Sequence, residues 1–409
     1  MKNVKINMLG LAVSAVVAGQ VSLASAGSFT QALKTGDVSG DVRLRYEAVD
    51  QETKDADAMT VRTRLSYTTG SMDGFSATVG MEDVRVVADM DEYNDATFGE
   101  YPASSVIADP EATELDQAYI QYQSGDKKNG LTVKAGRQVI AWDGQRFIGH
   151  VGWRQNRQTF DGLATQYKAG AFTARYAYIS ERNRIFADVK DVDSTDHLLN
   201  LSHKTAVGTL TGYSYMLSED PTTGADIDID TYGVSFKGAT RVDDVKYLYA
   251  FEYADQEKDV SGVTSKADYM LVEGGIAIAG ITAKLGYEIL GSDNGRYGFA
   301  TPLATGHKFN GWSDQFLGTP NAGLEDMYLS VSSKVAGGKL AVIYHDFSND
   351  VATLTGDDQG NELNVIYGKK FGKTYSAGVK YAAFDKGTSS SGKGGQDTDK
   401  LWVWVGAKF

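Results

Sequence analysis

The sequence predicts an all-β protein: a transmembrane antiparallel up-and-down β-barrel of about eighteen strands, with short turns at one rim and long loops at the other. Three observations predict it. Apolar and polar residues alternate along most of the chain, short connections alternate with long ones, and the chain ends on an aromatic residue within an alternating segment. After the N-terminal region, no apolar run approaches the ~20 residues that a membrane-spanning helix needs.

The N-terminal segment has the features of a secretory signal peptide. Two lysines precede a short apolar run at residues 8–18, and Ala24-Ser25-Ala26 forms a small-residue cleavage pattern. The apolar run is too short for a membrane anchor. We therefore expect a cleaved signal peptide at 1–26 and a single exported barrel domain at 27–409.

The composition fits an exported β protein that is held together without disulfides. The chain contains no cysteine, 46 glycines, 23 tyrosines and only 5 prolines. A closed, hydrogen-bonded sheet can supply the stability that disulfides give to other exported proteins. The formal charge of −13 argues against a nucleic-acid partner.

The first strand of the mature chain has two distinct faces. One face carries Val38, Gly40, Val42, Leu44, Tyr46 and Ala48, and the other carries Ser39, Asp41, Arg43, Arg45 and Glu47. Period-2 alternation is typical of a strand with unlike surroundings on its two sides. Because a barrel of this width is too large for side chains to fill, its polar face would line an aqueous lumen and its apolar face would meet lipid.

The last strand repeats this pattern and ends the chain. The apolar positions are Leu401, Val403, Val405, Ala407 and Phe409, and the lysines at 400 and 408 fall on the opposite face. A terminal aromatic residue after such alternation resembles the assembly signal of bacterial outer-membrane barrels. The expected partners are therefore outer-membrane lipid, lipopolysaccharide and, through Phe409, the barrel assembly machinery.

The connections predict which rim faces which side of the membrane. Long ones are expected at Ala88–Thr113, Ile140–Arg157, Asn183–Asp193, Asp293–Ala322, Asp350–Gln359 and Lys386–Gln396. The connections between them are short. Short periplasmic turns and long extracellular loops are the usual arrangement of outer-membrane barrels.

Arginines suggest what the lumen does. Four are expected on the inner wall, at Arg43, Arg45, Arg62 and Arg64, with Arg175 on a later strand. The loop Ile140–Arg157 is long enough to fold into the lumen and would bring Arg146, Arg154 and Arg157 opposite them. Fixed arginines favour anions and bind carboxylates through two hydrogen bonds. Asp143 and Asp161 would limit the mutual repulsion of these cations.

Arg137 is ambiguous. Strict alternation places it with the apolar residues that face lipid. The strand therefore either bulges at this point or has already left the bilayer.

Two segments carry a family resemblance. GRQVIAWDGQRFIGHVGWRQNRQTFDG (136–162) and FATPLATGHKFNGWSDQFLGTPNAGLEDMYLSV (299–331) resemble two blocks of the alginate-export family of outer-membrane porins. This resemblance implies a passive channel, since the known member carries an anionic uronate polymer outward through an arginine-lined pore. It also implies that Arg137, Arg146, Arg154 and Arg157 lie in or beside such a pore.

Other classes of function fit less well. The alternative within the same fold is a general diffusion porin for small hydrophilic solutes, without a specific site. Against an enzyme, the chain has five histidines and neither a G-x-S-x-G nor an H-E-x-x-H motif. An energy-driven receptor would need an N-terminal plug domain, and a purely structural or adhesive barrel would not need arginines around a long loop. We expect no catalytic residues, metal or cofactor.

Overall fold

The computed structural model describes residues 26–409 except 98–100, 127, 220–226, 354–355 and 391–394. The expected signal peptide at 1–26 lies outside the described residues, apart from Ala26 at the start of a short helix. No helix in the described part of the chain is both long and apolar enough to span a membrane.

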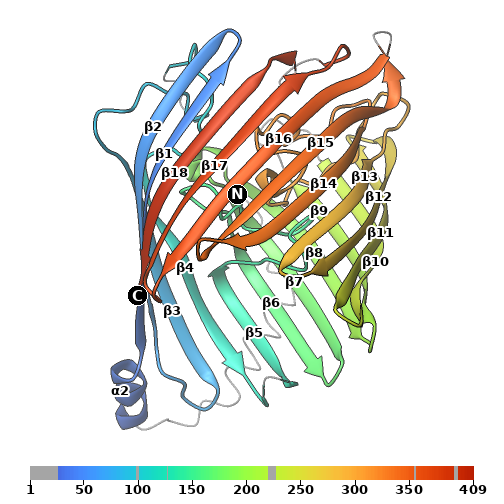
Figure 1. The fold of residues 1–409 in the computed structure, drawn as a ribbon. Coiled ribbons are helices and arrows are strands. Elements are labelled where there is room, and N and C mark those ends of the chain that lie inside the picture. Colours follow the sequence, from blue (N-terminus) through green and yellow to red (C-terminus); the bar gives the residue numbers. More distant parts are fainter. Residues whose placement is uncertain (1–25, 98–100, 127, 220–226, 354–355, 391–394) are drawn as a thin grey trace.

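Eighteen β-strands form a single closed antiparallel sheet, which confirms the predicted fold class. Each strand pairs with its neighbours in sequence, and β1 also pairs with β18 (Figure 1). The strands are β1 (Asp37–Gln51), β2 (Lys54–Thr68), β3 (Phe75–Val86), β4 (Ala112–Gln123), β5 (Asn129–Gln138), β6 (Thr159–Ala169), β7 (Phe172–Asn183), β8 (Val192–Lys204), β9 (Gly208–Glu219), β10 (Ile227–Val242), β11 (Val245–Val260), β12 (Val263–Ile278), β13 (Ile281–Leu290), β14 (Leu324–Val335), β15 (Gly338–Thr353), β16 (Gly356–Phe371), β17 (Tyr375–Lys386) and β18 (Thr398–Lys408). The helical elements are α2 (Ala26–Lys34), η1 (Ala187–Lys190) and η2 (Gly306–Lys308).

The two faces of the sheet meet different surroundings. On β18, Leu401, Val403 and Val405 are 36–51% exposed, whereas Lys400 and Trp402 between them are almost fully buried. The apolar side chains therefore face outward and the polar ones inward, as alternation predicts for a barrel in lipid. The exposed apolar positions on the other strands extend this outer surface around the barrel.

The seam between β1 and β18 closes the sheet. Their register runs from Asp41 opposite Lys408 to Gln51 opposite Thr398. At the lower rim, Gly40 N–H donates to the backbone oxygen of Phe409 (2.8 Å), and Phe409 N–H donates to that of Gly40 (3.0 Å). A side chain at Gly40 would collide with the Phe409 ring, so glycine leaves the space that this ring occupies beside the seam.

Long connections gather at the rim opposite α2 (Figure 1). They span residues 87–111, 139–158, 184–191, 291–323 and 387–397. The long loop predicted at Asp350–Gln359 was wrong, because β15 runs to Thr353 and β16 starts at Gly356. These strand ends carry polar residues on both faces, so their sequence lacks the alternation by which strands within the bilayer are recognised. The pairing of the two strands also shifts register near Ser348.

We predict that Gly40→Val lowers the stability of the barrel by ~1–3 kcal/mol, because the new side chain must displace the Phe409 ring. Gly212→Val is the matched control, since Gly212 lies on a strand in open space. The unfolding temperature of each variant in detergent, read from the gel shift between folded and unfolded barrel, checks this. Equal melting of the two variants would contradict it.

Candidate functional site

The β5–β6 loop (residues 139–158) is bound to the inner wall by arginines of β1 and β2. Arg43 donates to Gln155 Oε1 (2.9 Å) and to the backbone oxygens of Trp153 (2.8 Å) and the residue after it (2.7 Å). Arg45 donates to the same Trp153 oxygen (2.6 Å), and Arg64 donates to the Gln155 backbone oxygen (2.9 Å). The wall arginines therefore hold the backbone of the β5–β6 loop, which the sequence predicts to lie opposite them.

Arg154 lies at the centre of a buried charge network. Its guanidinium donates to both carboxylate oxygens of Glu47 (3.0 Å each) and to Asp314 (2.8 Å). Arg45 forms ion pairs with Glu47 (3.2 Å) and Asp109. Burial alone would lower the pKa of Arg154, but the two carboxylates beside it outweigh burial and raise that pKa. A buried ion such as this is tolerated only because its partners are in place.

A second group of charges holds the end of the loop. Arg157 binds Asp116 of β4 from its side chain (2.5 Å), and its backbone N–H donates to Glu82 (3.2 Å). Arg64 also pairs with Glu82. Burial, followed by the positive charges of Arg157 and Arg64, lowers the pKa of His150 to about 4. This histidine therefore stays neutral at physiological pH.

The other end of the β5–β6 loop packs against the opposite wall. Arg146 pairs with Glu288 of β13 (2.9 Å) and donates to Asn310 (2.9 Å). Beside it, the Phe147 ring lies 5.3 Å from the Tyr213 and Tyr269 rings. The two tyrosines belong to a buried cluster that also contains Ile140, Ile148, Leu303 and Phe316, and Phe147 packs against this cluster. Loop and wall thus form a hydrophobic core inside the lumen.

The β13–β14 loop (residues 291–323) completes this layer. Asp314 accepts hydrogen bonds from Lys400 of β18 (3.0 Å) and His307 Nδ1 (2.6 Å). Lys380 of β17 contacts His307 Nε2 (2.6 Å) and lies over the Trp153 and Trp312 rings, at 4.1 and 3.8 Å. A neutral His307 with its proton on Nδ1 satisfies both contacts, since it donates to Asp314 and accepts from Lys380. We call the two loops together the loop layer.

His307 has a strongly shifted protonation equilibrium. Burial lowers its pKa to about 3, and Lys380 and Arg154 add to this effect against the opposing charge of Asp314. The Asp314 carboxyl itself has a pKa well below its usual range, since His307, Lys400 and Arg154 outweigh the effect of its burial.

The remaining predicted residues take separate places. Arg62 pairs with Asp41 on the neighbouring strand (2.7 Å). Arg175 of β7 pairs with Asp143 at the tip of the β5–β6 loop (3.2 Å). Asn200 of β8 donates to the same carboxylate (2.8 Å) and so fixes the loop tip to a third part of the wall.

Arg137 and Asp161 lie apart from the loop layer and bind each other through two hydrogen bonds, of 2.8 and 2.9 Å. Arg137 pairs across the sheet with Ala118, which shares a face of β4 with the 61% exposed Ile120. Alternation therefore puts the pair on the outer face. The register of β5 is regular toward both of its neighbours, and the shift beside Asp161 lies between β6 and β7, so the bulge considered for the strand of Arg137 is not found.

The sequence predicts the arginines of this site but neither most of their carboxylate partners nor the lysines of the site. The residues not predicted are Glu47, Glu82, Asp109, Asp116, Glu288, Asp314, Lys380 and Lys400. Most occupy inward positions of alternating strands, so their facing was readable, but nothing in the sequence indicates which cation each one meets.

Two cations, Arg43 on the β1 wall against the loop layer and Lys308 within the layer, have only neutral oxygens as hydrogen-bond partners among the described residues. Arg43 bonds to the side-chain amide and backbone oxygens described above. Lys308 donates to the backbone oxygen of Gly144 (2.7 Å). Burial, followed by the ammonium groups of Lys237 and Lys284, lowers the pKa of Lys308. The positive charges of Arg43 and Lys308 therefore have no carboxylate partner among the described residues.

The match to a protein-family model covers residues 36–289, and the model describes alginate export. The chain belongs to the alginate export family. It is thus related to outer-membrane channels, and its barrel fold agrees with that assignment. No curated protein matches the chain significantly in sequence. Within the described residues, no group of three or more potential ligands is placed to hold a metal ion.

Solved structures show the same fold in other outer-membrane proteins. Acinetobacter baumannii OccAB4 matches with a TM-score of 0.71 at 13% identity, over 91% of this chain and 98% of that one. Pseudomonas aeruginosa OpdK matches with a TM-score of 0.69 at 13% identity, over 91% and 99% of the two chains. A structure of OpdK with vanillate matches with a TM-score of 0.68 at 13% identity, over 91% and 98%.

We predict that Arg154→Ala destabilises the loop layer by ~3–5 kcal/mol, because it leaves Glu47 and Asp314 buried with one cation fewer. Denaturant unfolding in detergent and the noise of single-channel current measure this. Arg85→Ala is the control, since the half-exposed Arg85–Asp83 pair is worth at most ~1 kcal/mol. Comparable losses in both variants would refute the central position given to Arg154.

We predict that acid weakens the loop layer through His307. Its pKa is about 3 when folded and ~6.5 when unfolded, so the unfolded chain binds more protons between these values. Stability is therefore full above pH ~6.5 and falls as the pH drops toward 3. His307→Gln keeps one donor and one acceptor without this titration, so its unfolding temperature should change less between pH 7 and pH 4.5. An unchanged pH dependence in the variant would contradict this.

Proposed function

We propose that the protein is a passive, non-enzymatic outer-membrane channel that prefers anionic or sugar-acid solutes. The observation that carries this proposal is that Arg43, on the wall beside the loop layer, and Lys308, within the layer, have no carboxylate partner among the described residues. Positive groups in a narrow passage lower the free energy of an entering anion and raise that of a cation. In a protein with a formal charge of −13, this local excess is opposite in sign to the whole chain.

The cations of the lumen fall into two groups, those paired with carboxylates and those with neutral partners, and this difference supports the proposed function. Arg45, Arg146, Arg154 and Arg157 are tied to carboxylates and fix the loops, so they contribute little free charge. Arg43 and Lys308 donate only to backbone and amide oxygens. A solute carboxylate can therefore approach them without displacing a protein carboxylate.

The comparisons support the same class of solute. The family is described by alginate export, and OpdK, which has the same fold, has been solved with vanillate. Alginate and vanillate are both anionic compounds. A general diffusion porin agrees less well with the site, because the loop layer and the wall form a buried hydrophobic core inside the lumen.

Export and insertion into the outer membrane would require the partners predicted from the sequence. We propose that the signal peptide at 1–26 is cleaved and that Phe409 directs barrel assembly before it seals the seam with Gly40. The apolar outer surface then meets lipid and lipopolysaccharide.

The reversal potential of single channels under a potassium chloride gradient tests the function. We predict an anion preference that falls in Arg43→Gln and again in Lys308→Gln, since each removes one uncompensated charge. Lys266→Gln is the control, because Lys266 pairs with Glu257 on the outward face of β12 and its side chain is 74% exposed. Absence of anion preference in the unmodified channel would overturn the proposal.

A further inference from the structure

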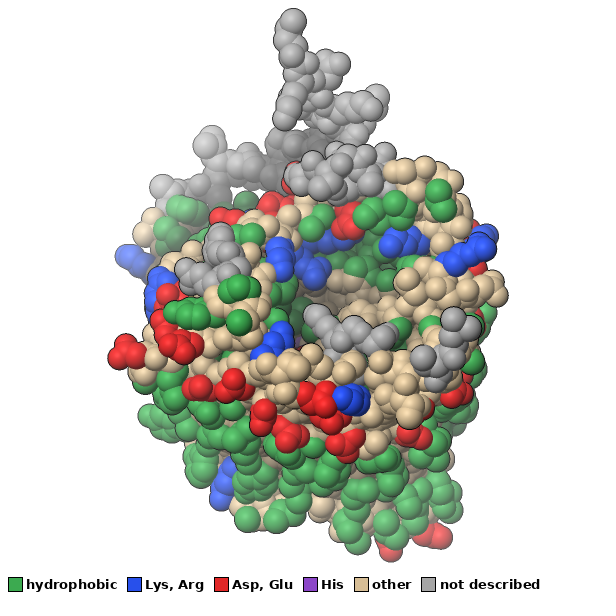
Figure 2. Space-filling model, turned by 90° about the horizontal axis from the view of Figure 1, so that it is seen from above, with side chains coloured by type: hydrophobic (Ala, Val, Ile, Leu, Met, Phe, Trp, Pro, Cys, Tyr) green, Lys and Arg blue, Asp and Glu red, His purple; other side chains and the backbone are tan. Residues whose placement is uncertain are grey.

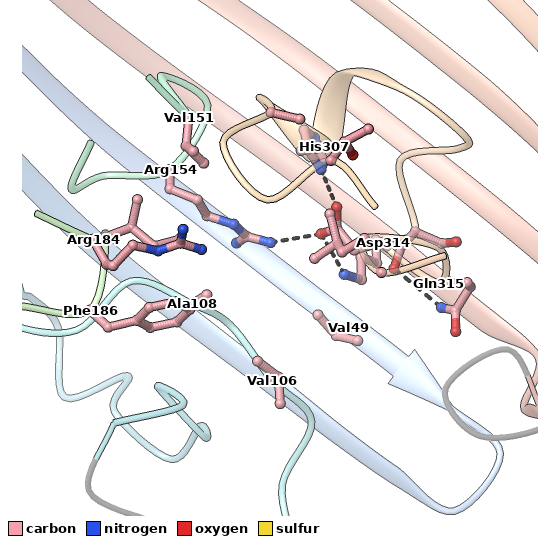
Figure 3. A pocket seen from close by; sticks show the side chains of 18 of the residues that line it. Val49, Val106, Ala108, Val151, Arg154, Arg184, Phe186, His307, Asp314 and Gln315 are labelled. Atoms are coloured by element: carbon pink, nitrogen blue, oxygen red, sulfur yellow. Dashed lines mark hydrogen bonds and ion pairs between the residues drawn. The ribbon is translucent and has the colours of Figure 1, made fainter. Parts of the chain in front are cut away.

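The helix α2 (Ala26–Lys34) takes no part in the channel site. Figure 2 shows the upper rim of the barrel hollowed, and a cavity of about 490 Å³ lies among the loops, lined in part by Arg154, His307 and Asp314 (Figure 3). This cavity belongs to the channel, since these residues fix the two loops of the loop layer. The helix lies at the opposite, lower rim, below the start of β1 (Figure 1). Transport through the lumen therefore does not explain it.

Two hydrogen bonds attach α2 to the lipid-facing side of the lower rim. The Tyr67 hydroxyl on β2 donates to the backbone oxygen of Leu33, and Gly70 N–H in the β2–β3 connection donates to that of Ala32 (2.8 Å). Tyr67 lies on the same face of β2 as Leu65, which is 41% exposed and points outward. The helix is therefore attached to the outer side of the barrel wall.

The two sides of α2 differ in polarity. Phe29 and Leu33 are four residues apart, so they lie on one side of the helix, and they are 57% and 44% exposed. Ala32 lies next to them around the helix axis and is buried. Gln31 and Lys34 lie on the other side and are exposed. The helix therefore presents an apolar surface beside the barrel wall and a polar surface away from it.

The apolar surface of α2 continues the lipid-facing surface of the barrel. Val38, at the start of β1, and Phe409, at the end of the chain, are 66% and 67% exposed. Both lie at the lower rim, where Phe409 is hydrogen-bonded to Gly40 across the seam. The exposed side chains of α2 thus extend the surface that meets lipid to the edge of the membrane.

The charge of α2 also fits a lipid surface. The helix has Lys34 in its last turn and no acidic residue, although the whole chain has a formal charge of −13. Phospholipid headgroups carry negative phosphates, and a cation beside an apolar helix face strengthens attachment to them. A helix of nine residues is too short to be stable alone in water. Contacts with the barrel on one side and with lipid on the other would together stabilise it.

We propose that α2 is an interfacial anchor that binds phospholipids of the inner leaflet of the outer membrane. Phe29 and Leu33 insert between the acyl chains just below the headgroups, and Lys34 lies against the phosphates. The helix directly precedes β1, which closes the barrel against β18. The anchor thereby holds the lower end of the seam at a fixed depth in the membrane. This role does not depend on the solute that the channel carries.

Fluorescence quenching in vesicles tests this inference, because the absence of native cysteine allows a single label. Phe29→Cys, Leu33→Cys and, as the matched control on the polar side, Gln31→Cys would each carry the dye NBD. The intact barrels are placed in vesicles of phosphatidylethanolamine and phosphatidylglycerol. We predict that lipids brominated on the acyl chain quench the dye at positions 29 and 33 roughly twofold or more above position 31. Iodide in the water should quench position 31 most. The gel shift between folded and unfolded barrel shows that each variant is folded.

Charge reversal tests the role of Lys34. With the dye at position 29, Lys34→Glu should reduce quenching by brominated lipid in the same vesicles, because the new carboxylate repels the anionic headgroups. Lys373→Glu is the matched control, since Lys373 is an exposed lysine in the β16–β17 turn at the same rim. Equal quenching in Lys34→Glu and in the control would contradict the contact of Lys34 with phosphates.

Two outcomes at position 29 would overturn the anchor itself. Equal quenching by brominated lipid at positions 29 and 31 would mean that the apolar side of α2 lies in water, open to a soluble partner. Shielding of position 29 from both quenchers, increasing with the ratio of protein to lipid, would mean that a second copy of the chain covers this side. The reversal potential of the channel is independent of both outcomes and tests only the proposed function.

Discussion

The structure depends on one constraint: in lipid, every backbone N–H and C=O group must find a partner within the protein. A closed sheet meets this constraint, and the reciprocal hydrogen bonds of Gly40 and Phe409 complete it at the lower end of the seam. Closure of eighteen strands leaves a lumen too wide for wall side chains to fill. The width of the barrel therefore makes its function depend on how the loops are held inside it.

Buried charges hold those loops. Hydrophobic contacts such as Phe147 against Tyr269 fix one end of the loop layer, but the other end meets a polar wall, where only hydrogen bonds and ion pairs can supply specificity. Arg154 connects the two loops, since it binds Glu47 on the wall and Asp314 in the β13–β14 loop. Most arginines of the lumen thus serve structure. In this account, the preference for anions comes from cations such as Arg43 and Lys308, whose hydrogen-bond partners are neutral.

The sequence allowed the fold to be predicted because lipid on one side and water on the other impose period-2 alternation on every strand. The prediction is wrong where the alternation ends, because β15 and β16 continue beyond the alternating region and their polar ends have the composition of a loop. The cations of the site were predictable from inward positions and from one arginine-rich loop. Their pairing was not, since Arg154 and Asp314 are far apart in sequence and meet only after closure. The cavity among the loops is lined by residues of several loops and of the ends of β1, β2 and β18, so no local pattern in the sequence predicts it.

The most direct test of the positive potential in the loop layer uses the absence of native cysteine. A side chain at Gly144 has space, with Lys237 Nζ 3.9 Å away, and Lys308 bonds to the Gly144 backbone oxygen. We would measure how fast Gly144→Cys reacts with an anionic and with a cationic thiosulfonate reagent, each relative to its rate with a free thiol. The account predicts faster reaction with the anionic reagent and a smaller difference at high salt. Equal rates, or a faster cationic reagent, would contradict it.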